Sequence, residues 1–218
     1  MAEERPRYDE KLALILRTAA AVFADKGFHR ASIRDISRAT GISLSGLYYY
    51  FGSKDELLFL IQDHCFGTLL DNLEELLAAE ADPYVRLHRF IENHLRFFAS
   101  NMREMKVLSH EAESLTGEYR RRVNAKKKRY TDHCMEILAR LRPEGSPIEL
   151  RVATFSLFGM LNWLYTWYRP DRDVPVDELA EEMSRLFLRG FLATEGEEMP
   201  TGAWRTAPGE PRPSIWRR

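Results

Sequence analysis

The chain has 218 residues, of which 44% are hydrophobic and 30% charged, with a formal net charge of −1. This length suits one or two compact domains, and the balanced charge excludes a protein that is basic throughout. The two cysteines, Cys65 and Cys134, stand apart in apolar surroundings, so we expect reduced structural thiols in a cytoplasmic protein. The charged, polar N-terminus does not have the pattern of a signal peptide.

The first predicted helix covers residues 9–26. Apolar side chains from Leu12 to Phe23 recur on one face, and Gly27 suits the left-handed end of a helix. Residues 1–8 are polar and contain arginines that could reach phosphates as an arm. A solvated terminus is the alternative interpretation, and the pattern alone favours it.

The stretch 32–51 contains two short helices joined by a tight turn. Ser32 and Asp35 form a capping box, Gly41 suits the turn, and Ser43 can cap the second helix. The second helix, residues 43–50, starts with small residues and ends with three consecutive tyrosines. These tyrosines cannot all be buried, because successive side chains point about 100° apart. The pattern predicts a helix-turn-helix with residues 43–50 as recognition helix; the alternative is a helical corner with solvated tyrosines.

Residues 9–60 resemble the N-terminal domain of TetR-family transcriptional regulators. The resemblance is carried by Phe23-Ala-Asp-Lys-Gly-Phe, Ser32-Ile-Arg-Asp-Ile, Gly41-Ile-Ser and Gly46-Leu-Tyr-Tyr-Tyr-Phe-Gly-Ser-Lys-Asp-Glu-Leu. It implies an all-helical homodimer whose C-terminal domain binds a small molecule and releases DNA. The DNA contacts that it implies are Ser32, Arg34, Ser43, Leu44, Ser45, Tyr48, Tyr49, Tyr50 and Lys54.

The DNA-binding segment has its own charge and one departure from the family pattern. Residues 28–54 hold four cations and one aspartate, a local charge of +3 that a dimer doubles. Family members often carry a basic or polar residue near the position of Leu44. Leucine there shifts base readout toward apolar contact with a thymine methyl group.

The rest of the chain reads as further helices. Ser53 caps a long predicted helix over residues 54–79, which starts at the DNA-binding segment and can transmit motion as a lever. Further helices are expected over residues 83–100, 103–114, 116–142, 148–168 and 176–194. The predicted fold is all-α: a three-helix DNA-binding domain (1–53), a ligand-binding and dimerisation domain of about six helices (54–195), and a Pro/Gly-rich tail (196–218). Trp204 and Trp216 could dock that tail, and a floppy tail is equally compatible with the sequence.

No convincing catalytic or metal-binding pattern is present. His88, His94 and His110 with Glu111 could converge on a metal, but their spacing fits no known ligand pattern, and core or pocket roles are the simpler interpretation. The run 120–129 carries seven cations. It is either a solvated helix face or a strip for a polyanion such as the phosphates of coenzyme A.

The segment 148–168 is almost wholly apolar but too short and interrupted for a membrane span. A helix that is apolar all round must be buried on every side, which a ligand pocket and a dimer partner would satisfy. The segment is similar to the corresponding helix of TetR-family repressors that respond to acyl-CoA thioesters. The residues assigned to the ligand are His94, Phe98, Phe158, Asn162, Trp163 and Thr166. Those assigned to the dimer seam are Trp167, Tyr168, Phe187 and Phe191, although the seam could take the whole tryptophan face instead.

The sequence therefore predicts a homodimeric transcriptional repressor that a hydrophobic effector, such as an acyl-CoA, releases from its DNA operator. No cofactor and no membrane partner is expected. Two alternatives stay open: an architectural DNA-binding protein without effector, and a helical enzyme acting on acyl thioesters. The enzyme needs a general base in the apolar pocket, and no such residue is evident.

Overall fold

The computed structural model of the chain describes residues 4–111 and 113–193, and the described residues are all-helical without a strand. The predicted fold class is therefore confirmed. In chain order the helices are α1 (Glu4–Lys26), α2 (Ile33–Thr40), α3 (Leu44–Tyr48), α4 (Lys54–Ala78), α5 (Pro83–Ser100), α6 (Met102–His110), α7 (Gly117–Leu141), α8 (Leu150–Asn162), α9 (Leu164–Trp167) and α10 (Val176–Phe191). The predicted tail lies outside the described residues, and the domain boundaries stay a prediction.

Local capping chemistry produces the helix-turn-helix. Ser32 accepts a hydrogen bond from the Asp35 amide while the Asp35 carboxylate accepts one from the Ser32 amide, so the capping box is complete. Gly41 ends α2 with φ 72°, a left-handed conformation that glycine adopts without steric cost. Ser43 then caps α3 by accepting from the Gly46 amide. Hydrogen bonds between residues that are close in sequence therefore set this turn.

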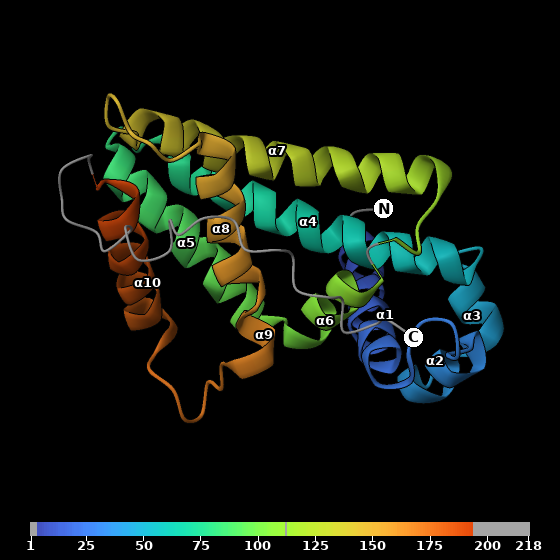
Figure 1. Ribbon diagram of the computed structural model, residues 1–218. Helices are drawn as coiled ribbons and strands as arrows, with labels where there is room; N and C mark the ends of the chain where they lie inside the picture. The colour runs from blue at the N-terminus through green and yellow to red at the C-terminus, as the bar shows by residue number, and fades with distance from the viewer. Residues whose placement is uncertain (1–3, 112, 194–218) are drawn as a thin grey trace, which may run out of the picture.

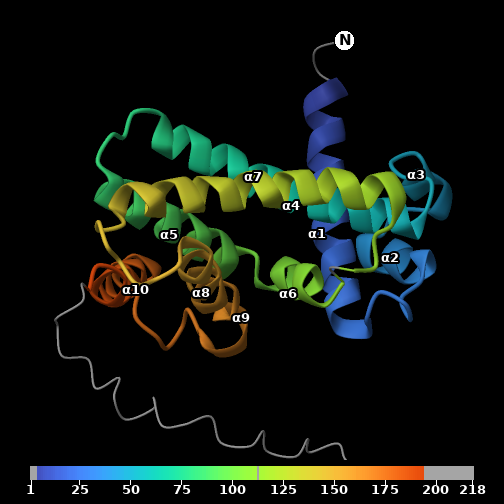
Figure 2. The same ribbon diagram turned by 45° about the horizontal axis from the view of Figure 1, so that its top comes forward.

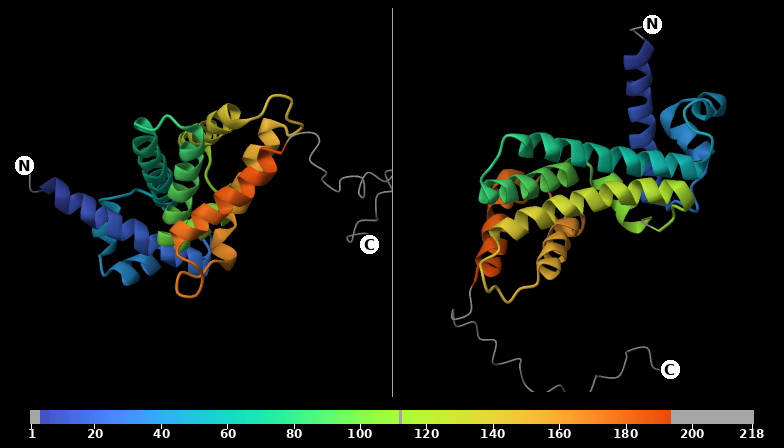
Figure 3. Two further views of the ribbon diagram at one scale, coloured as in Figure 1. Left: turned by 90° about the vertical axis from the view of Figure 1, so that its left-hand side faces the viewer. Right: turned by 90° about the horizontal axis from the view of Figure 1, so that it is seen from above.

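The elements α1–α3 gather at one end of the long helix α4, and α5, α8 and α10 lie at the other end (Figure 1). Helices α4 and α7 run alongside each other along the molecule, as all views agree (Figures 1 and 2). Helix α6 packs against α1, and α10 packs along α5. The N-terminal half of α1 extends beyond the body of the protein, beside α2 and α3 (Figure 3).

The apolar segment 148–168 does not form one helix. Helix α8 ends at Asn162 and the short α9 follows, with Trp163 between them. The expected burial on all sides is also incomplete, because Val152 is 54% exposed and Trp163 61% exposed. Among the described residues, no helix combines the length and apolarity that crossing a membrane requires.

Candidate functional site

The surface of α2 and α3 presents most of the side chains that the sequence assigned to DNA. Tyr49 is 74% exposed, Tyr48 is 52% exposed, and Arg34, Leu44 and Ser45 are exposed as well. The inner face of the same helix is closed by fully buried Leu47. Helix α3 therefore has one buried face, which contacts the core, and one exposed face of polar and aromatic side chains.

Two of the assigned serines are occupied by capping. The Ser32 hydroxyl donates to Asp35, and the Ser43 hydroxyl accepts from the Gly46 amide, so both side chains hold helix ends in the unbound protein. Hydrogen bonds from Lys26 and Ser32 hold the pKa of Asp35 well below its ordinary value. Asp35 therefore stays ionised and neutralises part of the local positive charge.

Tyr50 lies two residues beyond the end of α3, which is shorter than the predicted recognition helix, and faces α1. Its ring stacks on Tyr8 with centroids 4.9 Å apart, and Tyr49 meets Tyr8 edge-on at 6.0 Å. Tyr50 is accordingly half-buried, whereas Tyr49 keeps most of its surface free. The three tyrosines divide into two exposed rings and one ring that anchors the end of the recognition helix.

Lys54 has a different position from the one expected of a phosphate contact. Its ammonium donates to the carbonyl oxygens of Phe28 at 2.9 Å, Ala31 at 3.1 Å and His29 at 3.3 Å, and lies over the Phe28 ring. An ammonium has three donors, and all three have partners here. In the unbound protein Lys54 therefore ties α4 to the loop between α1 and α2, and any phosphate contact has to replace these bonds.

A partly open cavity of about 300 Å³ lies in the second half of the molecule, between α4, α5, α6, α7 and α8. Four of the six residues assigned to the ligand border it: His94, Phe98, Phe158 and Asn162. Its volume is at the small end of the range for ligand sites. Apolar and aromatic side chains make up most of the wall, which suits a compact hydrophobic ligand.

The other two residues assigned to the ligand, Trp163 and Thr166, do not border this cavity. Trp163 points to solvent, and the Thr166 hydroxyl donates to the Trp163 carbonyl oxygen. Neither residue borders the cavity, because α8 ends at Asn162 and the chain turns away there. The sequence also missed contributions from α6, namely Met105, Leu108 and Ser109, for which it contained no distinguishing signal.

The basic run on α7 is mostly neutralised. Arg121, Lys126, Lys128 and Arg129 pair with carboxylates. The guanidinium of Arg122 lies over the Phe59 ring. Lys127 alone in the run borders the cavity, with its ammonium over the Phe66 ring. Burial and the neighbouring Arg120 lower the pKa of Lys127. The structure therefore favours a solvated helix face for most of the run, with one cation at the cavity.

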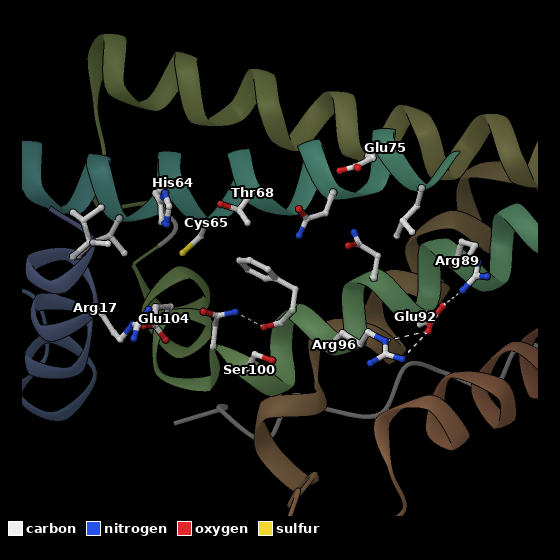
Figure 4. A pocket seen from close by; sticks show the side chains of 18 of the residues that line it. Arg17, His64, Cys65, Thr68, Glu75, Arg89, Glu92, Arg96, Ser100 and Glu104 are labelled. Atoms are coloured by element: carbon white, nitrogen blue, oxygen red, sulfur yellow. Dashed lines mark hydrogen bonds and ion pairs between the residues drawn. The ribbon is translucent and has the colours of Figure 1, made fainter. Parts of the chain in front are cut away.

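A second, open groove of about 1030 Å³ lies between α1, α4, α5 and α6 and is lined mainly by polar side chains (Figure 4). Glu92 in this groove pairs with both Arg89 and Arg96. Cys65 and Phe97 border the groove and the cavity alike, so they form a wall between the two hollows. Burial, with the nearby Glu104, raises the pKa of the Cys65 thiol to about 12 and makes it unreactive.

Three of the four residues assigned to the seam, Tyr168, Phe187 and Phe191, are buried inside one chain. Tyr168 is buried and donates to the Val174 carbonyl oxygen, and the buried rings of Phe187 and Phe191 stack at 5.6 Å. Trp167 is the exception, at 48% exposed.

Exposed apolar side chains gather on α8 and α10. On α8 they are Val152, Phe155 and Trp163, which share one face at helical spacing with exposed Gly159 between them. On α10, Leu186 is 67% exposed and Gly190 follows one turn later. An added Cβ would meet nothing within 4 Å at either glycine. Large apolar side chains beside open glycines are the composition of a helix-packing surface.

Helix α6 joins the cavity to the DNA-binding end. After its last residue, the Glu111 carboxylate accepts a hydrogen bond from the Phe28 amide at 3.3 Å and one from the Ser114 hydroxyl at 2.6 Å. The Glu111 carbonyl oxygen also accepts from the Gln62 side chain on α4. A shift of α6 therefore acts directly on the loop after α1.

Two of the histidines considered as metal ligands, His88 and His94, lie beside hydroxyl groups; the side chain of His110 is outside the described part of the structure. His88 Nδ1 lies 3.1 Å from the Ser184 hydroxyl, and His94 Nδ1 lies 3.4 Å from the Tyr130 hydroxyl. Within the described ranges, no three side chains of the metal-binding types gather.

Two family models match the chain. Residues 15–61 match the model described as bacterial regulatory proteins, tetR family, and residues 80–191 match the tetracyclin repressor-like C-terminal domain. Among curated proteins, the fatty acid metabolism regulator protein of Bacillus subtilis is 23% identical over 195 residues, covering 88% of this chain and 98% of the relative. The repressor KstR2 of Rhodococcus jostii is 24% identical over 187 residues, covering 82% and 90%. These relatives are transcriptional regulators and not enzymes.

Solved structures give the same assignment. The TetR-family regulator PfmR from Thermus thermophilus is 33% identical with a TM-score of 0.73, covering 82% of this chain and 99% of that chain. AibR, crystallised with isovaleryl coenzyme A and operator DNA, is 28% identical with a TM-score of 0.72, covering 81% and 97%.

Proposed function

The chain belongs to the tetR family of bacterial regulatory proteins, and on that premise we propose that it is a homodimeric repressor released from its operator by an acyl thioester. The observation that carries the proposal is the largely apolar cavity, whose wall includes α4 and α6. Both helices also contact α1, so an occupant of the cavity can act on the DNA-binding end. The protein would act in the cytoplasm, where its operator is accessible.

The proposed DNA contacts are the exposed groups Arg34, Leu44, Ser45, Tyr48 and Tyr49, with Lys54, Ser32, Ser43 and Tyr50 in support. Two recognition helices must lie roughly 34–36 Å apart to enter successive major grooves. The proposed seam is the exposed apolar face of α8 with Leu186 of α10, because a second copy would remove these side chains from water. Ligand and operator would then weaken each other by the same factor.

The effector class rests on two observations. The cavity is lined mainly by apolar side chains with few polar groups, and Lys127 is a cation at its wall. In addition, the B. subtilis relative regulates fatty acid metabolism by its printed name, and AibR binds isovaleryl coenzyme A. An acyl-CoA fits both features of the cavity: its acyl group would contact the apolar wall, and its anionic coenzyme A part would lie beside Lys127.

An operator-release assay tests the proposal. Fluorescence anisotropy with a DNA fragment selected by this protein would measure operator affinity with and without octanoyl-CoA. We expect octanoyl-CoA to weaken binding by about 5- to 150-fold, the range of coupling between two sites. Unchanged affinity across acyl-CoAs of two to sixteen carbons would favour the architectural DNA-binding protein instead.

A tyrosine pair tests the DNA surface in the same assay. Tyr49→Phe removes one exposed hydroxyl, and we expect about tenfold weaker operator binding, the value of a hydrogen bond to a charged group. Tyr84→Phe is the matched control, because Tyr84 is 51% exposed on α5, away from α3. Equal affinities for the two variants would remove Tyr49 from the interface.

A further inference from the structure

The cavity wall contains a buried polar atom that makes no hydrogen bond of good geometry. His94 is 2% exposed, and its Nε2 makes no hydrogen bond to the described residues. The Asn162 side chain lies beside the ring and favours its protonated form without completing such a bond. The ring cannot turn away easily, because it stacks on Phe98 with centroids 4.1 Å apart and meets Phe158 edge-on at 6.1 Å. A buried polar atom without a partner is rare and marks a position that a ligand can complete.

The partner of the other ring nitrogen decides what Nε2 offers. Tyr130 is buried, so its hydroxyl proton must reach an acceptor, and His94 Nδ1 lies 3.4 Å away. Burial raises the pKa of Tyr130, and the nearby Asn93 side chain, whose amide nitrogen donates to the Leu69 carbonyl oxygen, opposes that rise. Donation by this hydroxyl to Nδ1 corresponds to the tautomer that carries the proton of the neutral imidazole on Nε2.

His94 remains neutral under working conditions. Burial lowers its pKa to about 3, with a smaller opposing effect from Asn162. A neutral N–H donor in an apolar wall suits a neutral acceptor, because a buried carboxylate would need a full compensating charge. A carbonyl oxygen meets this requirement, and an alkyl chain without one does not.

We propose that His94 is the specificity-determining residue of the effector site, donating its Nε2 proton to the carbonyl oxygen of an acyl thioester, with Tyr130 as the positioning residue that fixes the tautomer. The inference rests on the proposed function and adds the atom that recognises the thioester. The cavity of about 300 Å³ has room for about ten groups of roughly 30 Å³ each, enough for an acyl chain of medium length.

Two probes that differ only at the carbonyl test the proposal by calorimetry. One is the thioester of octanoic acid with N-acetylcysteamine; the other is the octyl thioether of the same thiol. The full-length wild-type protein should bind the thioester about three- to tenfold more tightly, the value of one hydrogen bond between neutral groups. In His94→Phe, which keeps a ring of similar shape, the two probes should bind equally.

Tyr130→Phe tests the positioning role. We expect the preference for the thioester to fall, and the nitrogen NMR signals of His94 to change from the single Nε2-protonated tautomer to a mixture. A merely structural role for Tyr130 would lower both affinities together and leave their ratio unchanged. If His94→Phe does not fold, Tyr130→Phe and the wild-type NMR spectrum provide the test.

The outcomes separate the two levels of the argument. Equal binding of both probes by the wild-type protein, or a preference that survives in His94→Phe, overturns the role of His94 and leaves the proposed function standing. Absence of binding for either probe, together with unchanged operator affinity in octanoyl-CoA, overturns the effector class and His94 with it.

Discussion

Gly41→Ala tests whether the turn of the helix-turn-helix depends on a left-handed residue. Gly41 has φ 72°, and an added Cβ would meet no atom within 4 Å, so the change introduces backbone strain without a steric clash. The strain costs about 1–2 kcal/mol. The lower entropy of the unfolded alanine chain offsets about 0.4–1 kcal/mol of this. The expected net loss of about 1 kcal/mol lowers Tm by about 2–4 °C in a protein of this size.

A glycine remote from the DNA surface provides the control. Gly145, in the loop between α7 and α8, has φ 76° and equally open surroundings, so Gly145→Ala should lower Tm by a similar amount. Circular dichroism gives Tm, and fluorescence anisotropy gives operator affinity. Gly41→Ala should weaken operator binding at least about threefold, because relief of the strain reorients α3, whereas Gly145→Ala should leave it unchanged. Equal operator affinities for the two variants, or an increase in Tm for Gly41→Ala, would refute this reasoning.

Three further predictions concern other parts of the molecule. Lys54→Met should lower the unfolding free energy by about 2 kcal/mol in urea titrations, because three carbonyl oxygens lose a charged donor. Exposed Lys128→Met should change it little, and equal losses would contradict the structural role of Lys54. Leu186→Glu should convert the dimer to a monomer in analytical ultracentrifugation. The control Leu14→Glu, which also replaces an exposed leucine, should leave the dimer intact, and a dimer in both variants would exclude the α10 seam. The lowered pKa of His94 means that the unfolded chain takes up a proton there as pH falls below about 6.5 while the folded chain does not, so acid destabilises the fold. Between pH 7 and pH 5 the wild type should lose about 2 kcal/mol more unfolding free energy than His94→Phe, and parallel pH profiles would show that His94 is not buried as a neutral group.

The parts of the fold that local chemistry decides were predictable from the sequence. The capping box at Ser32, the turn at Gly41 and the cap at Ser43 involve neighbours in the chain, and the structure has all three. The start of α5 at Pro83 and the end of α1 just before Gly27 follow from the same kind of local rule. The first helix starts earlier than predicted, at Glu4, because polar residues give a weak apolar stripe although they can continue a helix.

The faces of the apolar helices were not predictable in the same way. Apolar periodicity predicts that Phe187 and Trp163 lie on apolar helix faces. Whether such a face contacts the core, the cavity or a partner chain depends on helices that are distant in sequence. Phe187 packs within one chain, while Trp163 remains exposed past the end of α8. Lys54 shows the same limit for a charged residue, because its three acceptors lie 23 to 26 positions away in the chain.

The wall between the cavity and the larger groove is a position where a substitution could change which ligand the protein binds. Cys65 and Phe97 alone, among the described lining residues, belong to both hollows. Replacing Phe97 by a smaller residue would join the cavity to the larger groove. Bulkier or branched ligands would then have room without any rearrangement of the helices. Sensors for larger molecules are therefore accessible through change at a single position, while the surface that reads the operator remains intact.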